Sequence, residues 1–406
     1  MFVLAARYRP GFRRTGEERQ HQGEEAMKIK RNAAAAALLA CGLAISTSAA
    51  LASGYRTSLL DTQGAVGSTA WGLNDSGQVT GHVTALDGGT RASLWQPYGA
   101  RVELEHMGSA LSSRASAIDA AGTVVGVSVL GLAPDSPEYF ATVWSRDGRA
   151  RALATLGPGQ SWANGINDAG HIVGAFSHIV ASQSRTDAVR WDADGTFHTL
   201  ASLGGNYSQA NGINGRGQVV GYSGTADGGG GAVLWESDGS IRQLAVLGAE
   251  MRFTWATRIN AHGQVVGQSH ASFEDAQARA STWLPDGSVQ ALPQGGAIGA
   301  SAYALNDAGT VVGFSILGGG QHRATIWEQG TAQDLNRFID AELAQAGWYF
   351  SEARAINEGG WVAGEARNSM TGEVRGFVLS PVPEPAGYAL MLSGLVALMA
   401  WRRRGT

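Results

Sequence analysis

One phrase recurs seven times along the chain, and this repetition constrains the fold more than any other feature. Each copy carries an asparagine, or once an aspartate, at the same place, which we call the marker residue. An alanine stands four residues before every marker, and glycines stand three and seven residues after it, as in "GINDAGHIVG" from Gly165 to Gly174. The markers, spaced 45 to 51 residues apart, are Asn74, Asp119, Asn167, Asn214, Asn260, Asn306 and Asn357.

The repeated phrase has the chemistry of a tight hairpin. An Asn or Asp side chain at the start of a turn bonds to nearby backbone, and the glycine three residues later accepts a positive φ. The Val- and Ile-rich run that follows, as in "HIVG", favours a strand. The second glycine lies inside this strand, where glycine is unfavourable unless another backbone comes close. The phrase therefore predicts strand, turn, strand, and its constant residues are geometric requirements rather than a site.

A second hairpin follows the first in each copy. Six copies contain an apolar run that ends in tryptophan, at Trp95, Trp144, Trp191, Trp235, Trp283 and Trp327. A turn such as "ADG" or "SDG" and a leucine-bearing strand come next. Because four strands in about 45 residues match one propeller blade, we predict an all-β, seven-bladed β-propeller of four-stranded blades over residues 53–380. We expect the tryptophans to pack between adjacent blades.

The seventh copy lacks a fourth strand, and the start of the body supplies a spare one. The last copy ends at "GFVLS" before Pro381, whereas the segment at about 55–64 has the pattern of an outer strand with no blade before it. We predict that this segment pairs beside residues 376–379 and closes the ring, because closure removes an unpaired sheet edge. In the long segment before the last blade, 334–353, helical spacing of apolar residues predicts a short helix.

The repeats resemble the HAF family of extracellular repeat proteins. That family combines an "INxxGxVVG"-type segment with a "HAFxW"-type segment. Here the first segment fits well, whereas only the alanine and tryptophan of the second are kept, as in "DAVRW". The resemblance covers residues 68–380 and implies an extracellular repeat architecture rather than a particular activity.

We interpret the first 52 residues as processing segments. Residues 27–52 have a positive start, an apolar run and a small-residue cleavage signal, so they predict a signal peptide that signal peptidase cuts between Ala52 and Ser53. Residues 1–26 are rich in arginine and precede Met27, which we interpret as the true start; the alternative is an extended positive region. Cys41 is the only cysteine, and a lipid-modified Cys41 is an alternative to its removal with the signal peptide.

Residues 381–406 have the pattern of a C-terminal sorting signal. Pro383, Glu384 and Pro385 precede a nearly all-apolar segment, 386–401, and the cluster Arg402, Arg403 and Arg404 follows it. The apolar segment is near the lower length limit of a transmembrane helix, and the arginines favour a cytoplasmic end. This order resembles the PEP-CTERM sorting signal of Gram-negative, exopolysaccharide-producing bacteria. The resemblance implies export across the inner membrane, transient anchoring, cleavage by an exosortase-like membrane protease and delivery to the cell surface or matrix. The alternative is a plain membrane anchor.

The body between these ends is acidic. Residues 53–380 carry a net charge of −10 with histidine neutral, so they lack the positive footprint expected for binding nucleic acid. The histidines are scattered, and neither a phosphate loop nor a nucleophile elbow is present in the sequence. The turns also lack the ligand series of a calcium loop. We therefore assign no catalytic residue, metal or cofactor.

Two variable positions, five and three residues before each marker, provide the candidate ligand-binding residues. If the first strand of each blade lines the central channel, these side chains ring one opening of it. Aromatic, arginine and amide side chains there are suited to binding a sugar or a peptide. The alternative is that Trp162 and Trp255 only plug the channel. The candidates are Trp71, Arg114, Trp162, Asn164, Gln209, Asn211, Trp255, Tyr303, Glu352 and Arg354.

The sequence thus predicts an exported, non-catalytic binding or structural propeller at the cell surface or in the matrix, with exopolysaccharide as the expected ligand. One alternative is a propeller enzyme, a lyase or hydrolase, that acts on extracellular polysaccharide. Another is a structural matrix component without a specific ligand. Converging polar groups with an acid or histidine among them would favour the enzyme, whereas an aromatic-lined surface would favour binding.

Overall fold

The computed structural model describes residues 54–97, 100–131, 137–272 and 277–382, all of which lie in one compact unit, Leu51–Thr406. The predicted signal peptide with its cleavage site, Ala52 and Ser53, lies outside the described residues, and so does the sorting segment from Pro383 onward, for which the sequence predicts a helix at 386–401. Within the described ranges, no helix is long and apolar enough to cross a membrane.

The described residues form 28 strands, with four strands for each of the first six repeats. The first repeat contains β2 (Gly67–Leu73), β3 (Val79–Thr84), β4 (Thr90–Trp95) and β5 (Arg101–Glu103); the second contains β6 (Ala110–Ile118), β7 (Val124–Gly131), β8 (Pro137–Trp144) and β9 (Ala150–Ala152). The third contains β10 (Gln160–Ile166), β11 (Ile172–Val180), β12 (Gln183–Trp191) and β13 (Phe197–Thr199); the fourth contains β14 (Gly204–Ile213), β15 (Val219–Thr225), β16 (Gly230–Trp235) and β17 (Ile241–Gln243).

The later repeats follow the same plan. The fifth contains β18 (Phe253–Ile259), β19 (Val265–His270), β20 (Arg279–Trp283) and β21 (Val289–Ala291); the sixth contains β22 (Gly299–Leu305), β23 (Val311–Ile316), β24 (His322–Glu328) and β25 (Thr331–Asp334). The seventh has three strands of its own, β26 (Trp348–Ile356), β27 (Val362–Asn368) and β28 (Val374–Pro381). The N-terminal strand β1 (Tyr55–Leu59) precedes them all.

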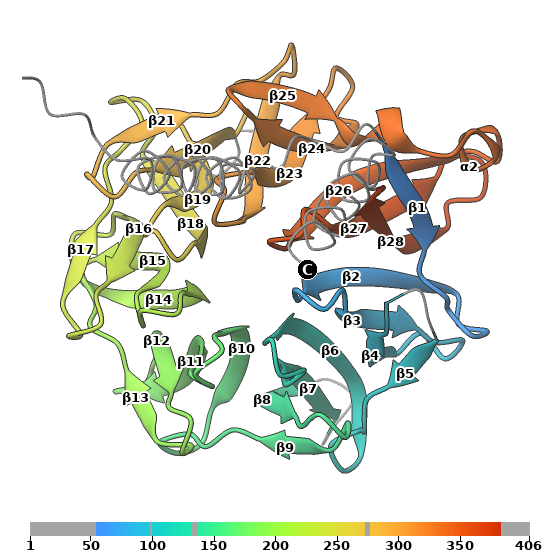
Figure 1. Ribbon diagram of the computed structural model, residues 1–406. Helices are drawn as coiled ribbons and strands as arrows, with labels where there is room; N and C mark the ends of the chain where they lie inside the picture. Colours follow the sequence, from blue (N-terminus) through green and yellow to red (C-terminus); the bar gives the residue numbers. More distant parts are fainter. Residues whose placement is uncertain (1–53, 98–99, 132–136, 273–276, 383–406) are drawn as a thin grey trace, which may run out of the picture. The chain divides into compact units, whose positions relative to one another are not determined.

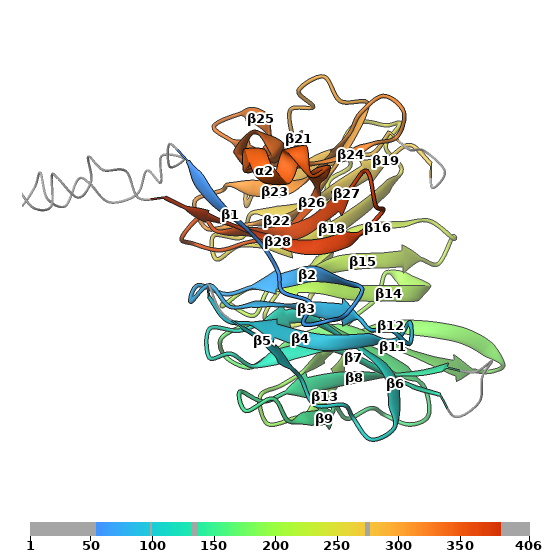
Figure 2. The ribbon, with the colours of Figure 1, turned by 90° about the vertical axis from the view of Figure 1, so that its right-hand side faces the viewer.

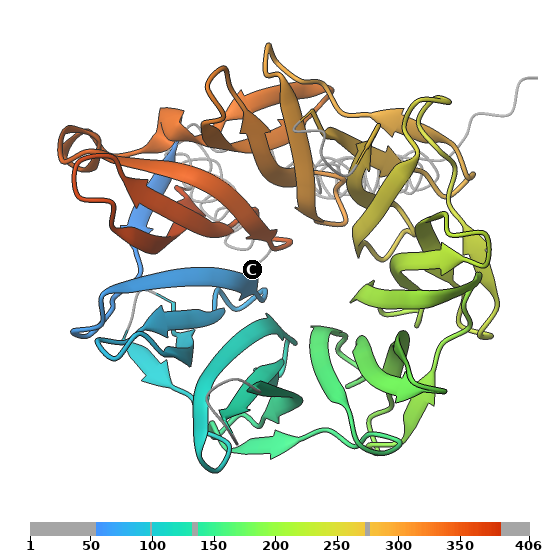
Figure 3. The same cartoon turned by 180° about the vertical axis from the view of Figure 1, so that it is seen from behind.

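The strands pair into five four-stranded sheets and one eight-stranded sheet. The eight-stranded sheet consists of the third and fourth repeats, joined by a single parallel pairing of Thr186 with Tyr207. Figures 1 and 3, from opposite sides, show the sheets of this unit following one another around a common centre, with the first strand of each repeat innermost. The all-β prediction and the four-stranded units are confirmed.

The N-terminal strand completes the last sheet. Strand β1 pairs antiparallel with β28, from Tyr55 opposite Pro381 to Leu59 opposite Phe377, as the sequence predicted for this segment. Figure 2 shows β1 crossing beside β28 before the chain enters β2. The paired strand is shorter than the predicted 55–64, because the chain turns at Thr62–Ala65 toward the first repeat.

The constant residues of the phrase build the turn that the sequence predicts. In the third repeat, the backbone N–H of Gly170 donates to the carbonyl of Asn167, and the Asn167 side chain accepts from the N–H of His171. Gly170 has a φ of 79°, and the equivalent glycine has a positive φ in all seven repeats. The second glycine, Gly174, lies so close to β10 that an added Cβ would be 1.8 Å from the carbonyl oxygen of Trp162. Both glycines are therefore needed for backbone geometry.

The marker residues also link the repeats in a cycle. The side-chain Nδ2 of an asparagine marker donates to the backbone carbonyl of the next marker, for example from Asn167 to Asn214 at 3.0 Å. The bond from Asn357 to the carbonyl of Asn74, also 3.0 Å, joins the last repeat to the first. The other four bonds run from Asn74 to Asp119, Asn214 to Asn260, Asn260 to Asn306 and Asn306 to Asn357. Asp119 cannot donate, so the cycle lacks one bond of this kind.

Six tryptophans fill the space between neighbouring sheets, as predicted. Trp191 packs with Val125, Ala141 and Val143 of the preceding repeat, and the other five occupy equivalent mixed clusters. Each indole N–H donates to a carbonyl that follows an outer strand; for Trp95 that carbonyl belongs to Asp61, directly after β1. Strand β1 is the outer strand of the seventh repeat's sheet, and it stands in the same relation to the first repeat as the outer strand of each repeat does to the next repeat.

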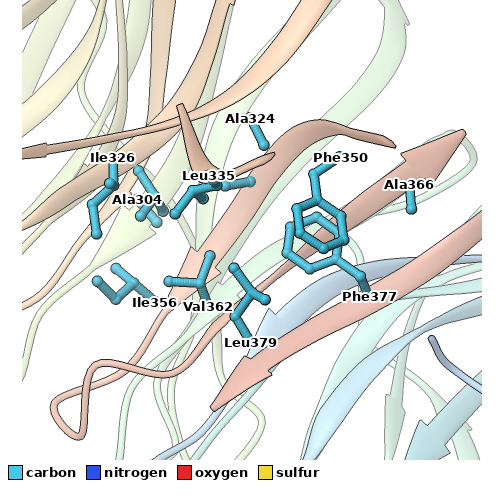
Figure 4. Close-up of a cluster of buried hydrophobic side chains, with 12 residues drawn as sticks. Ala304, Ala324, Ile326, Leu335, Phe350, Ile356, Val362, Ala366, Phe377 and Leu379 are labelled. Carbon is cyan, nitrogen blue, oxygen red and sulfur yellow. The ribbon is translucent and has the colours of Figure 1, made fainter. Parts of the chain in front are cut away.

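The seventh repeat has Leu379 in place of this tryptophan, since Leu379 pairs with Val362 as Trp191 pairs with Ile172. Figure 4 shows Phe350 and Phe377 face to face in the cluster between the sixth and seventh repeats, and their ring centroids are 4.2 Å apart. The predicted helix before this repeat is present as two short pieces, η1 (Leu335–Phe338) and α2 (Ala341–Gln345). Buried Leu335 anchors the first piece in this core, whereas the second buries no residue.

Candidate functional site

A β-bulge interrupts the first strand of every repeat at the same place. In the third repeat Ala163 pairs with Gly174 and Gly165 pairs with Val173, which leaves Asn164 as the extra residue. The same shift occurs in the other six repeats. Since a bulge re-aims the side chain of its extra residue, the position three before each marker is directed differently from its neighbours. These bulge residues are Trp71, Ser116, Asn164, Asn211, Thr257, Tyr303 and Arg354.

All seven bulge residues line one cavity of about 340 Å³, which we call the central cavity. Because every repeat contributes, the cavity lies where the seven first strands meet. Four further residues complete its lining: Gln209, Trp255, Arg258 and Gln268. Among the residues that the structure describes, its wall therefore combines aromatic rings, amides, hydroxyls and two arginines, without a carboxylate or an imidazole.

Seven of the ten sequence-predicted site residues line the central cavity, and three do not. Trp162 instead packs on Tyr139 of the preceding repeat, with ring centroids 5.5 Å apart. Arg114 is exposed, and Glu352 is buried in an ion pair with Arg354. The cavity brings together Trp71, Asn164, Gln209, Asn211, Trp255, Tyr303 and Arg354.

A chain of hydrogen bonds along β14 leads toward the central cavity. The Tyr207 hydroxyl donates to Gln209 Oε1 at 2.6 Å, and Gln209 Nε2 donates to Asn211 Oδ1 at 2.9 Å. Asn211 Nδ2 then donates to the carbonyl of Ala256 in the next repeat. These bonds hold the amides of Gln209 and Asn211 in fixed orientations at the cavity wall.

A second hollow, the aromatic recess, shares Trp255 with the central cavity. Tyr207, Tyr222 and the glycine-rich β15–β16 turn line its volume of about 320 Å³. Trp255 stacks on Tyr222 with ring centroids 4.4 Å apart and an interplanar angle of 15°. Burial raises the pKa of both tyrosines, so their hydroxyls stay protonated donors near neutral pH.

A charged cluster borders the cavity on the side of the last repeat. Arg354 pairs with Glu352 at 2.8 Å and lies over the ring of Trp71, with its guanidinium carbon 3.9 Å from the ring centroid. The other oxygen of Glu352 is 3.1 Å from Nδ1 of His322. Burial, and secondarily the Glu352 carboxylate, raises the pKa of Tyr303 well above its usual range.

Four residues of the cavity wall are not among the ten sequence-predicted residues: Ser116, Thr257, Gln268 and Arg258. The charged one of these four is Arg258. It lies two residues before its marker, where every other repeat has glycine or alanine. Its Nη1 donates to the carbonyls of Asn211 and Thr257, at 2.8 and 2.9 Å. Among the described residues no carboxylate lies within ion-pair distance of Arg258, and burial lowers its pKa. This single departure from a constant small-residue position was a signal available in the sequence.

The pKa of His82 is lowered by burial and by two neighbouring arginines. Burial, and secondarily the charges of Arg114 and Arg354, lowers the pKa of His82 to about 4. The ring is therefore neutral at physiological pH. In the part of the chain that the structure describes, no group of three or more His, Cys, Asp or Glu side chains could hold a metal ion.

Residues 381–404 match the PEP-CTERM protein-sorting motif, which confirms the predicted sorting signal. The motif indicates an exported protein that is transiently anchored in the membrane, and it implies recognition by an exosortase-like membrane protease. No curated protein sequence matches the chain. The resemblance to HAF-type repeats stays a prediction.

Several solved structures are similar to this chain at low identity. The acylaminoacyl peptidase of Pyrococcus horikoshii is 10% identical, with a TM-score of 0.48; the match covers 82% of this chain and 55% of the peptidase, so the chain spans about half its length. A gluconolactonase from Xanthomonas campestris is 13% identical, with a TM-score of 0.39 and coverage of 83% and 94%. The six-bladed β-propeller lectin of Aleuria aurantia is 12% identical, with a TM-score of 0.35 and coverage of 70% and 99%. With TM-scores below 0.5, these similarities carry no argument about fold or activity.

Proposed function

We propose that this chain is an exported, non-catalytic seven-bladed β-propeller that binds exopolysaccharide at its central cavity, at the cell surface or in the matrix. The signal peptide and signal peptidase begin its export, and the sorting motif at 381–404 brings it to an exosortase-like protease. The seven-bladed, closed arrangement is supported by the cyclic marker bonds, the pairing of β1 with β28 and the cavity that all seven first strands share.

The observation that carries the binding proposal is the composition of the cavity wall. Trp71, Trp255 and Tyr303 offer aromatic faces, and sugars stack their apolar faces on such rings while their hydroxyls bond to fixed amides. Gln209 and Asn211 are amides of this kind, because their hydrogen bonds already fix their orientation. The aromatic recess continues this surface beyond Trp255, so a chain of several sugar units has room at two adjoining hollows.

The lack of an acid or imidazole in the cavity wall favours binding over catalysis. A general acid or base must reach the reacting group by hydrogen bonding, and none of the eleven lining residues carries a carboxylate or imidazole. Arg354 of the cavity wall is already paired with Glu352.

Binding of the full-length chain, kept in detergent, to a glycan array and to the producer's own exopolysaccharide tests this proposal. We expect saturable binding that the double variant Trp71→Ala/Trp255→Ala weakens at least tenfold, about 1.4 kcal/mol. Failure of the wild type to bind any glycan would refute the proposal and favour a structural matrix component.

The enzyme alternative has one observation in its favour, the Glu352–His322 pair beside the cavity. A paired carboxylate and imidazole are the groups that acid–base cleavage of a polysaccharide requires. Incubation of the full chain with the exopolysaccharide, followed by assay of new reducing ends, tests it. Cleavage that Glu352→Gln abolishes would establish the enzyme, whereas unchanged polymer length in the presence of binding would exclude it for that substrate.

A further inference from the structure

We propose, resting on the function proposed above, that the central cavity selects an acidic sugar whose carboxylate binds the guanidinium of Arg258. The sugar ring would lie on the aromatic wall near Trp255 while its carboxylate reaches the arginine. The ligand class is thus a uronate-containing glycan rather than a neutral one.

Arg258 is positioned for this role by the neighbouring repeat. Its side chain runs across Gly212 of β14, where an added Cβ would be 3.4 Å from Arg258 Cδ. The two carbonyls that bind its Nη1 hold the guanidinium in place at the cavity wall. A guanidinium fixed in this way loses little conformational entropy when it binds a planar carboxylate.

The remaining nitrogens of Arg258 are available to a ligand. Nε and Nη2 have no hydrogen-bond partner among the described residues, and neither belongs to the buried polar atoms that lack one. Together they form the edge of the guanidinium that binds a carboxylate with two parallel bonds. A neutral sugar leaves this edge without a charged partner.

The charges of the wall favour an anion although the body as a whole is acidic. In the part of the chain that the structure describes, the wall contains two arginines and no acid; Glu352 neutralises Arg354, whereas Arg258 has no carboxylate partner. An acidic polymer would be repelled by most of the surface and attracted here, so the charge pattern directs it to the cavity.

The aromatic wall argues for a sugar rather than an acidic peptide. Trp255, which stacks on Tyr222 with Tyr207 beside them, places aromatic side chains at both the central cavity and the aromatic recess. A pyranose presents a flat apolar face of matching size, whereas an extended peptide does not.

Substitution of Arg258 by alanine is well suited as a test, because glycine or alanine already occupies this position in the other six repeats. The variant should therefore fold. A matched control is Arg149→Ala, which removes the same charge from an exposed turn at the rim of the second repeat, 82% exposed in its side chain. Arg258→Lys keeps the charge but lacks the planar fork.

Calorimetric titration of the full-length chain should compare a trigalacturonate with its carboxyl-reduced, neutral counterpart and with a sulfated neutral trisaccharide. We expect the wild type and Arg149→Ala to bind the uronate at least tenfold more tightly than the reduced sugar. Arg258→Ala should lose this preference while it still binds the reduced sugar, and Arg258→Lys should keep part of it. Thermal unfolding of each variant establishes that it is folded.

Any one of four results would overturn the inference. A wild type that binds the reduced sugar as tightly as the uronate leaves the proposed glycan function intact but removes the acidic class. Equal binding of the sulfated sugar replaces carboxylate selection by general anion binding. If a folded Arg258→Ala protein still binds the uronate more tightly than the reduced sugar, groups other than Arg258 cause the preference. If no saccharide of this set or of the array binds, the proposed function and the inference fail together.

Discussion

Asp119 breaks the cycle of marker bonds, so replacing it with asparagine should stabilise the protein. Its carboxylate already occupies the place of an asparagine side chain, since Oδ1 accepts the backbone N–H of Thr123 at 2.7 Å, as Oδ1 of Asn74 accepts from Gln78. The residue is 6% exposed, yet it cannot donate to the carbonyl of Asn167. The variant Asp119→Asn supplies the missing donor without moving the backbone.

The size of the effect follows from the equivalent bonds. Five of the other six markers make this contact at 3.0 to 3.2 Å in buried surroundings. One buried neutral hydrogen bond contributes about 1 kcal/mol net. For a chain of this size we expect the melting temperature to rise by about 1–3 °C. The reverse change, Asn214→Asp, removes one bond and buries a carboxylate, so it should cost about 1–3 kcal/mol.

Urea unfolding followed by tryptophan fluorescence measures both variants against the wild type at pH 7.5. A higher midpoint for Asp119→Asn and a lower one for Asn214→Asp would support the role of the marker bonds. A lower midpoint for Asp119→Asn, or an unchanged midpoint for both variants, would refute the reasoning, because the cycle would then contribute nothing to stability.

Three further predictions concern the frame. Gly221→Ala should destabilise by about 3 kcal/mol or more, because its Cβ would be 1.9 Å from the carbonyl oxygen of Gln209, whereas Gly215→Ala, with nothing within 4 Å, should be tolerated in the same unfolding assay. Trp235→Phe removes the 2.6 Å hydrogen bond to the Ala201 carbonyl and leaves a void where the buried indole packs, so it should lower stability by about 1–3 kcal/mol; an unchanged midpoint would contradict this. The pKa of His82 is about 4 in the folded protein and about 6.5 in the unfolded chain, so as the pH falls the unfolded chain is protonated at a higher pH than the folded protein. Stability should therefore fall as pH drops below about 6.5, by about 2 kcal/mol at pH 5, and a His82→Gln protein that is equally sensitive to acid would contradict it.

The frame could be predicted from the sequence because its geometry repeats. The positive φ at Gly170 and the close backbone at Gly174 each favour glycine over every other residue type. Glycine therefore occupies the equivalent positions in every repeat. The pairing of β1 with β28 was predictable from the lack of a fourth strand in the seventh repeat.

The site could be predicted only in part, because the β-bulge interrupts the alternation of the first strand. In a regular strand, the side chains five and three residues before a marker point to the same face of the sheet. The bulge redirects the side chain three residues before the marker, so that it points toward the central cavity. Trp255 lines the cavity whereas its equivalent Trp162 packs on Tyr139, and nothing in the local sequence distinguishes the two. Tyr207 and Tyr222 were missed because only the fold brings them beside Trp255.

This difference between two equivalent tryptophans offers the most direct test of glycan binding at the central cavity. Trp255 and Trp162 both lie five residues before their markers, but only Trp255 lines the cavity and the aromatic recess. Calorimetric titration with fragments of the producer's exopolysaccharide should show at least tenfold weaker binding for Trp255→Ala and a change of less than twofold for Trp162→Ala. Equal losses in both variants, or full binding by a folded Trp255→Ala protein, would contradict the assignment of the central cavity as the binding site.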